Sequence, residues 1–253
     1  MSLPLRALLF RRTMEPTTIS VAFDQEIYLV RVRRHARARR YTLRIQATTH
    51  EVVLTMPPRG SLKTAREFAE KHGGWIAARL KRLPQAAPFA EGRRLPLRGV
   101  EHTIAHRRGR RGTVWTEIEG EERLLCVAGE APHVPRRVRD FLKREAKRDL
   151  EVASRRAAQA LGIVFRRVSI RDQASRWGSC STTGVLSYSW RLIMAPPFVL
   201  DYLAAHEAAH LVEMNHSRAF WRLVERICPE MAKAKAWLNT HGAELHRYGM
   251  ADD

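Results

Sequence analysis

Cysteine, acidic residues and long apolar runs are all scarce in this sequence. The 253 residues include three cysteines, Cys126, Cys180 and Cys228. An odd number of widely spaced cysteines excludes a disulfide framework and a cysteine-based zinc ribbon. We therefore expect a reducing, cytoplasmic environment. No apolar run reaches the roughly 18–20 residues that span a bilayer, so we expect no membrane span.

Positive charge is abundant by contrast. The chain has 45 Lys and Arg against 26 Asp and Glu, a formal net charge of +19. Local basic blocks lie at 31–40 (RVRRHARARR) and 106–111 (HRRGRR). A field of this sign attracts anions, so non-specific contact with nucleic acid is one interpretation. The other is an ordinary solvated basic surface, because no recognised nucleic-acid-binding motif accompanies the charge.

Strand patterns dominate the first half of the chain. Partial alternation of apolar and polar residues predicts strands at 26–34, 40–48, 51–57, 99–107, 113–119 and 123–129. A helical pattern interrupts them over 61–83, where Gly73-Gly74 is a candidate break. We expect residues 1–18 to be disordered and residues 19–130 to form a β-rich, basic N-terminal region.

Helical periodicity dominates the second half. Apolar residues at helical spacing predict a helix from Pro135 to Gly162. Two strands and three helices should follow, at 165–172, 184–195, 197–213, 217–228 and from 229 onward. We find no internal sequence repeat. The expected fold class is α+β, with a β-rich part followed by a mainly helical domain over residues 131–253.

The stretch AAHEAAHLVEMNHS (204–217) places charged and polar groups in an apolar run. His206 and His210 are four residues apart on the predicted helix, so both imidazoles project from one face and can meet one ion. Glu207 lies too far round the helix to be a comfortable third ligand. It can instead accept a proton from a metal-bound water. Hydrogen-bonded structural histidines are the alternative interpretation.

His216 is the candidate third ligand. It lies six residues after His210, so a straight helix would place the two side chains on different faces. The helix must therefore end between them, and we expect Asn215 to end it in the left-handed conformation. Ser217 is a good N-cap for the next helix.

A second segment, SRWGSCSTTGVLSYSWRLIMAP (175–196), precedes the histidine helix. Arg176 and Arg191 are candidates for binding a carboxylate or phosphate. Tyr188 is a candidate hydrogen-bond donor to a developing oxyanion. Alternatively, Trp177 and Trp190 belong to the core and Tyr188 is an ordinary strand residue.

The adjacent Ser179 and Cys180 raise the question of a covalent nucleophile. A serine or cysteine nucleophile needs a base within hydrogen-bond reach. The sequence offers no evident base for either residue, so we favour metal chemistry over covalent catalysis.

The segments SRWGSCS, LSYSWRLIMAP and DYLAAHEAAHLVEMNHSRAFWRLV together resemble the YgjP-like metallopeptidase family, a branch of the zincins similar to the SprT and WLM groups. The similarity is close over residues 165–247 and looser before them. It implies a zincin-like, zinc-dependent hydrolase with His206, His210 and His216 as ligands and Glu207 as general base or acid. Trp190-Arg191 and SRWGSC match the family's other motif. The long zincin form has a glycine where this chain has Glu213.

The expected activity is therefore hydrolysis of peptide bonds by zinc-activated water, with a peptide or protein as substrate. We expect the strand over 184–192 to pair with an extended peptide. A metal-dependent phosphohydrolase acting on nucleotides uses the same ligands, and so does a basic nucleic-acid-associated module with structural zinc. In the structural case, His241 or His246 would supply a fourth ligand.

Overall fold

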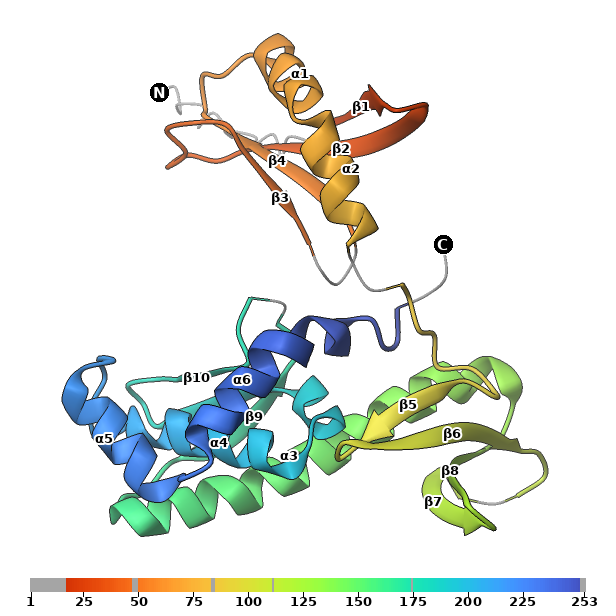
Figure 1. The fold of residues 1–253 in the computed structure, drawn as a ribbon, viewed down its shortest axis with the longest axis vertical. Helices are drawn as coiled ribbons and strands as arrows, with labels where there is room; N and C mark the ends of the chain where they lie inside the picture. Colours follow the sequence, from red (N-terminus) through yellow and green to blue (C-terminus); the bar gives the residue numbers. More distant parts are fainter. Residues whose placement is uncertain (1–16, 47–49, 83–84, 111, 174, 251–253) are drawn as a thin grey trace, which may run out of the picture. The chain divides into compact units, whose positions relative to one another are not determined.

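The chain forms two compact units, Met1–Leu83 and Pro84–Asp253 (Figure 1). The computed structural model describes residues 17–46, 50–82, 85–110, 112–173 and 175–250. Strands and helices occur in both units, which confirms the α+β class. Most of the expected disordered segment, residues 1–16, lies outside the described residues, and residues 17 and 18 begin a strand.

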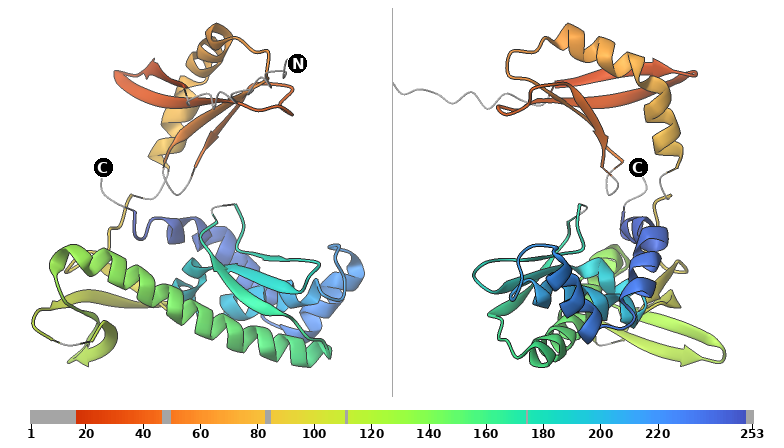
Figure 2. Two further views of the ribbon diagram at one scale, coloured as in Figure 1. Left: turned by 180° about the vertical axis from the view of Figure 1, so that it is seen from behind. Right: turned by 60° about the vertical axis from the view of Figure 1, so that its left-hand side comes forward.

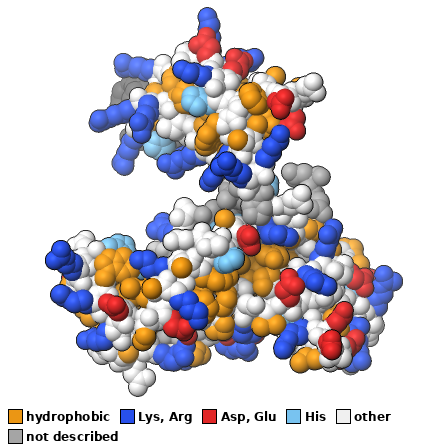
Figure 3. Space-filling view, in the orientation of Figure 1, with side chains coloured by type: hydrophobic (Ala, Val, Ile, Leu, Met, Phe, Trp, Pro, Cys, Tyr) orange, Lys and Arg blue, Asp and Glu red, His pale blue; other side chains and the backbone are white. Residues whose placement is uncertain are grey.

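The first unit is a four-stranded sheet with helices on one face. Its strands are β1 (Thr17–Phe23), β2 (Glu26–Arg34), β3 (Thr42–Ile45) and β4 (Val52–Met56), in the order β1-β2-β4-β3. Helices α1 (Leu62–Lys71) and α2 (Gly73–Lys81) complete the unit. The helical pattern is broken as predicted, but at His72 and not at Gly73-Gly74, which are the first residues of α2. Lys and Arg predominate over Asp and Glu on the face of this unit that Figure 3 shows.

Alternation along β2 explains how this sheet packs. Val30 and Val32 are buried in the core with Leu54 and Ile76, whereas Ile27 and Leu29 are exposed. Successive side chains of a strand point to opposite faces, so the helices cover one face and the other stays open within the unit.

The second unit opens with a sheet of the same topology. Its strands are β5 (Arg94–Leu97), β6 (Val100–Arg107), β7 (Val114–Glu119) and β8 (Glu122–Ala128), in the order β5-β6-β8-β7. In both sheets the successive pairings are antiparallel, parallel and antiparallel. A helix follows each sheet in the chain. The structure thus contains a repeated arrangement although the sequence has no detectable repeat.

Helix α3 (Val134–Leu161) is the long central helix of the second unit (Figure 2). The 3₁₀ turn η1 (Ala131–His133) precedes it, Pro135 lies in its first turn, and Gly162 ends it with φ of 67°. Both predicted boundary residues are confirmed, because proline suits the first turn and glycine adopts the left-handed conformation at low cost.

A small sheet and several helices complete the second unit, some packed on α3 and others on the helix that carries the histidines. Strands β9 (Arg167–Arg171), β10 (Gly178–Cys180) and β11 (Val185–Ser189) form a sheet in the order β10-β11-β9. The other elements are η2 (Trp190–Met194), α4 (Pro197–Ala209), α5 (Arg218–Ile227), α6 (Met231–His241) and η3 (Gly242–His246). The prediction of one strand over 184–195 is wrong beyond Ser189, because all five residues of η2 are buried and cannot alternate between two faces. Among the described helices, none is both long and apolar enough to cross a membrane.

Candidate metal centre

Helix α4 carries the first two histidines into the interior of the second unit. Its alanines Ala204, Ala205, Ala208 and Ala209 are all buried. Such small side chains let a helix approach its neighbours closely, and α4 packs on α3 and α6. His206 therefore lies within a buried helix and His210 is its C-cap residue, one turn further on.

The structure brings three histidines together. One ring nitrogen from each of His206, His210 and His216 lies within 4.8 Å of the others. The Nε2 atoms of His206 and His216 are 3.2 Å apart. Two nitrogens at 2.0–2.1 Å from a tetrahedral ion are about 3.3 Å apart, so this pair fits a shared metal. The donor set of three imidazoles also suits zinc.

The chain turns sharply between the second and third histidines. Helix α4 ends at Ala209, and Leu211, Val212 and Glu213 donate backbone hydrogen bonds to Ala208 and Ala209. The prediction that Asn215 ends the helix in the left-handed conformation is wrong, because Asn215 is not among the residues with positive φ.

Glu213 also has no positive φ, so this turn does not require the glycine found in long zincins. The predicted N-cap is confirmed at the start of the next helix. Ser217 Oγ accepts a hydrogen bond from the backbone N–H of Phe220.

Hydrogen bonding and burial favour the neutral form of the imidazoles and fix which ring nitrogen of His210 is free. His210 Nδ1–H donates to the carbonyl oxygen of Glu213 at 3.2 Å, which leaves its Nε2 free to bind an ion. Burial, with the charges of His210, His216 and Lys235, lowers the pKa of His206 to about 4. Burial also lowers the pKa of His210. Both rings are thus neutral near pH 7, as metal ligands must be.

Aromatic rings wall the cluster. The Phe220 ring centroid lies 4.9, 4.5 and 4.8 Å from those of His206, His210 and His216. Trp221 stacks on His216 at 5.6 Å. These rings fix the orientation of the imidazoles and exclude water from one side of the cluster.

Glu207 is a buried carboxylate beside the histidines. Only 4% of the residue is exposed, and its Oε2 atom has no hydrogen-bond partner among the described residues. Burial raises its pKa to about 8, and the positive charge of Arg176 acts in the opposite direction. The side chain lies against Gly178, where a Cβ atom would be 2.8 Å from the carboxyl carbon. A buried carboxyl group with a raised pKa is able to exchange a proton near neutral pH.

Strand β10 is the edge of its sheet next to Glu207. Among the described strands, β11 lies between β10 and β9 and has both edges paired. The expectation that the strand over 184–192 pairs with a peptide is therefore wrong. The edge at 178–180 is the one that adjoins Glu207 through Gly178.

Comparison with known proteins identifies the family. A family model described as the YgjP-like metallopeptidase domain matches residues 39–241. The chain belongs to the YgjP-like metallopeptidase family. The crystal structure of the metallopeptidase zymogen abylysin from Pyrococcus abyssi is similar, with 27% identity over 39% of this chain and 97% of that chain and a TM-score of 0.34. No curated protein matches the chain.

The segment 175–196 of this YgjP-like chain, which precedes the histidine helix, lies partly near Glu207 and partly in the core. Arg176 is exposed and acts electrostatically on Glu207. Trp177 stacks on His246 with ring centroids 5.0 Å apart. Trp190 is fully buried. Trp190 therefore belongs to the core, and Trp177 packs against it and on His246.

Tyr188 and Arg191 both use their polar groups within the protein. The Tyr188 hydroxyl is 3.0 Å from Ser154 Oγ on α3, and both residues are buried. Buried Arg191 donates through Nε to Asp172 at 2.9 Å. Its Nη1 donates to three backbone carbonyls near the C-terminus, those of Leu245, His246 and Tyr248. The guanidinium thus ties the C-terminal segment to η2, and its Nε and Nη1 donors are used within the protein.

The two downstream histidines lie outside the cluster. Within the described part of the chain, the group that can hold a metal contains only His206, His210 and His216. His241 packs against Trp237, and His246 against Trp177. A set of three candidate ligands would leave one position of a tetrahedral ion open, the arrangement typical of catalytic zinc.

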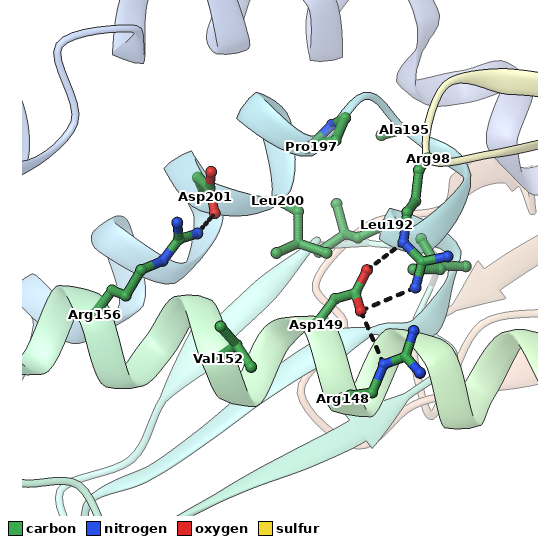
Figure 4. Close-up of a pocket in the computed structure, with 11 residues that line it drawn as sticks. Arg98, Arg148, Asp149, Val152, Arg156, Leu192, Ala195, Pro197, Leu200 and Asp201 are labelled. Carbon is green, nitrogen blue, oxygen red and sulfur yellow. Dashed lines mark hydrogen bonds and ion pairs between the residues drawn. The ribbon is translucent and has the colours of Figure 1, made fainter.

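A cavity of about 350 Å³ lies between α3, η2 and α4 (Figure 4). Its floor is apolar, and its arginines are paired with carboxylates. Arg98 donates to Asp149 at 2.6 Å, and Arg156 to Asp201 at 2.5 Å. Paired charges leave this cavity no free cation for an anionic ligand.

Sequence reasoning missed two parts of the site. The Glu213 carbonyl that orients His210 carries no sequence signal, because any residue supplies a carbonyl. Gly178 carried one, since a glycine inside a family motif indicates close approach of a neighbour.

Proposed function

We propose that this YgjP-like metallopeptidase is a zinc enzyme in which His206, His210 and His216 hold the metal and Glu207 is the general base. The convergence of three imidazole nitrogens within 4.8 Å carries this proposal. The buried carboxylate of Glu207, on the same helix, supports the assignment of the base. The HExxH spacing is that of zinc peptidases.

The chemistry of the donors favours zinc. Neutral imidazoles do not neutralise a divalent ion, so the metal would keep its full charge. When bound, zinc supplies a Lewis acid that lowers the pKa of a water to about 7 and polarises a carbonyl. The hydrogen bond from His210 to Glu213 and the aromatic wall of Phe220 hold the ligands in place.

Glu207 carries the proton in the proposed reaction. Its carboxylate accepts a proton from the attacking water and delivers it to the leaving amine. The packing against Gly178 holds the carboxylate in place for both transfers. Arg176 favours the ionised form that starts the cycle.

The substrate we propose is an extended peptide bound along β10. An edge strand has unpaired N–H and C=O groups that can pair with a peptide backbone. Because Gly178 in β10 touches Glu207, a peptide paired there would lie close to the base. Backbone pairing of this kind selects peptides over nucleotides.

We place the enzyme in the cytoplasm. Cys126, Cys180 and Cys228 are all free. Unpaired cysteines are typical of reducing compartments.

The test compares wild-type protein with Glu207→Gln, using a quenched fluorescent peptide library and metal analysis of both proteins. We expect the variant to keep its zinc and lose at least about 10²-fold in hydrolysis, because proton transfer contributes about 10²–10⁴-fold. A phosphodiester substrate serves as the control for the alternative chemistry. Equal peptide hydrolysis by both proteins, or cleavage of the phosphodiester alone, would contradict the proposal.

A further inference from the structure

A second groove runs along α3 on the side next to the cavity with paired arginines. Strand β9 lies beside α3 there, and among the described strands it is the outer strand away from β10. Two hollows lie between α3 and the segment 163–172, with volumes of about 330 and 500 Å³. We call this the α3–β9 groove. The α3–β9 groove follows the length of β9. Figure 2 shows the strand β9 alongside the helix α3.

Six unpaired cations line the α3–β9 groove. Lys143, Arg144 and Arg155 belong to α3. Arg167 and Arg171 belong to β9, and Arg166 directly precedes it. None of the six makes an ion pair with a described acidic residue, and all but Lys143 are exposed.

The carboxylates of the α3–β9 groove are already engaged. Asp172 pairs with Arg191 at 2.9 Å, and Glu151 with Lys147 at 3.9 Å. The groove therefore keeps a large excess of positive charge. On the neighbouring side of the same helix, each cavity arginine pairs with a carboxylate. The difference between the two sides is not explained by packing, because exposed unpaired arginines contribute little to stability.

We propose that the α3–β9 groove binds a single-stranded nucleic acid through its phosphates. Cations on both walls fit a linear polyanion better than a flat lipid surface. Lys143 and Arg155 are twelve residues apart, which is about 18 Å along the helix and long enough to contact several successive phosphates of one strand.

One end of the α3–β9 groove is also suited to binding a nucleobase. Val164, 93% exposed, and Phe165 line it together with Arg155 and Arg166. An apolar or aromatic surface next to cations is the usual arrangement for an unstacked base and its phosphate.

The groove is separate from the metal centre. Strand β11 lies between β9, which borders the groove, and β10, which adjoins Glu207. A nucleic-acid strand bound in the α3–β9 groove would leave β10 accessible to a peptide. The binding we propose is therefore independent of peptide hydrolysis, and each can be tested while the other is monitored.

The test is a salt titration of binding to a fluorescein-labelled oligo(dT) of fifteen nucleotides, followed by fluorescence anisotropy. The groove variant is Arg144→Gln, Arg155→Gln, Arg171→Gln, which changes exposed residues that have no ion pair. The matched control, Arg93→Gln, Arg123→Gln, Arg226→Gln, removes three exposed charges of the same unit that lie outside both the groove and the basic block 106–111. Both variants carry the same net charge.

Three lost phosphate contacts should reduce the slope of log Kobs against log salt by about 2, since each contributes about 0.7 for a single strand. We expect the groove variant to bind at least about tenfold more weakly at 0.1 M salt and the control to match wild type. Both should keep their metal and peptide hydrolysis. Equal losses in both variants, or none in the groove variant, would overturn the proposal. Displacement of the oligonucleotide by polyglutamate at equal charge concentration would overturn it in favour of acidic proteins.

Discussion

Gly178 offers the sharpest test of how Glu207, the proposed general base, is positioned. In Gly178→Ala, the new Cβ would lie 2.8 Å from the Cγ and Cδ atoms of Glu207. Carbon atoms pack comfortably at about 3.5–4.0 Å, so the carboxyl group must move by about 0.7 Å or more. Glu207 is 4% exposed and has little room to absorb the shift. A displacement of about 1 Å at a reacting group costs about 10²-fold in rate, or about 2.7 kcal/mol.

The assay is hydrolysis of a quenched fluorescent peptide, with metal content and thermal unfolding measured on the same samples. We expect kcat/KM to fall about 30- to 100-fold while bound metal is unchanged. Ser179→Ala is the matched control, because neighbouring residues of a strand point to opposite faces. Its unchanged activity would also exclude Ser179 as a nucleophile. The reasoning is refuted if Gly178→Ala hydrolyses peptide as fast as Ser179→Ala.

Three further predictions concern residues around the site. Tyr188→Phe removes the hydroxyl paired with Ser154, so we expect a loss of about 1 kcal/mol in urea unfolding and unchanged kcat; a large fall in kcat would restore the oxyanion role. Arg191→Met leaves three C-terminal carbonyls and Asp172 without their donor, and should lower the free energy of unfolding by about 2–4 kcal/mol. Burial lowers the pKa of His246 to about 4, below its unfolded value of about 6.5, so the unfolded state binds more protons between these values. Stability should therefore fall by about 1–3 kcal/mol as the pH drops from 6.5 to 4, and less in His246→Phe; equal pH slopes in the two proteins would contradict this assignment.

The sequence was most informative where chemistry follows from local spacing. The spacing of His206 and His210 places both rings on one helix face whatever the rest of the fold does. The N-cap of α5 at Ser217 and the end of α3 at Gly162 were also predicted from local sequence. Each depends on one side chain or one backbone conformation.

Features that depend on the tertiary fold were not predicted. Strand β10 has three residues and no alternation to detect, although its edge position matters for the site. The polar groups of Tyr188 and Arg191 were open to a substrate role in sequence, and only the packing of α3 and the C-terminal segment reveals their partners. Asn215 was expected to take a left-handed conformation, but backbone bonds to Ala208 and Ala209 already turn the chain.

Strand order was equally hidden. Strands β1 and β5 were not expected, and without them neither four-stranded sheet is complete. The two sheets share one topology while their sequences do not repeat, because a sheet requires an apolar face and turns rather than particular residues. The sequence-based domain limit at 130/131 likewise differs from the division into compact units after Leu83.

Metal content tests the central claim most directly. Wild type and His210→Ala, purified without chelators, are compared by elemental analysis after incubation with one equivalent of zinc and removal of free metal. The account predicts about one zinc per chain in wild type and loss of most of it in the variant, because removing one of three ligands breaks the site. Equal zinc in both proteins, or none in wild type, would contradict a metal centre at His206, His210 and His216.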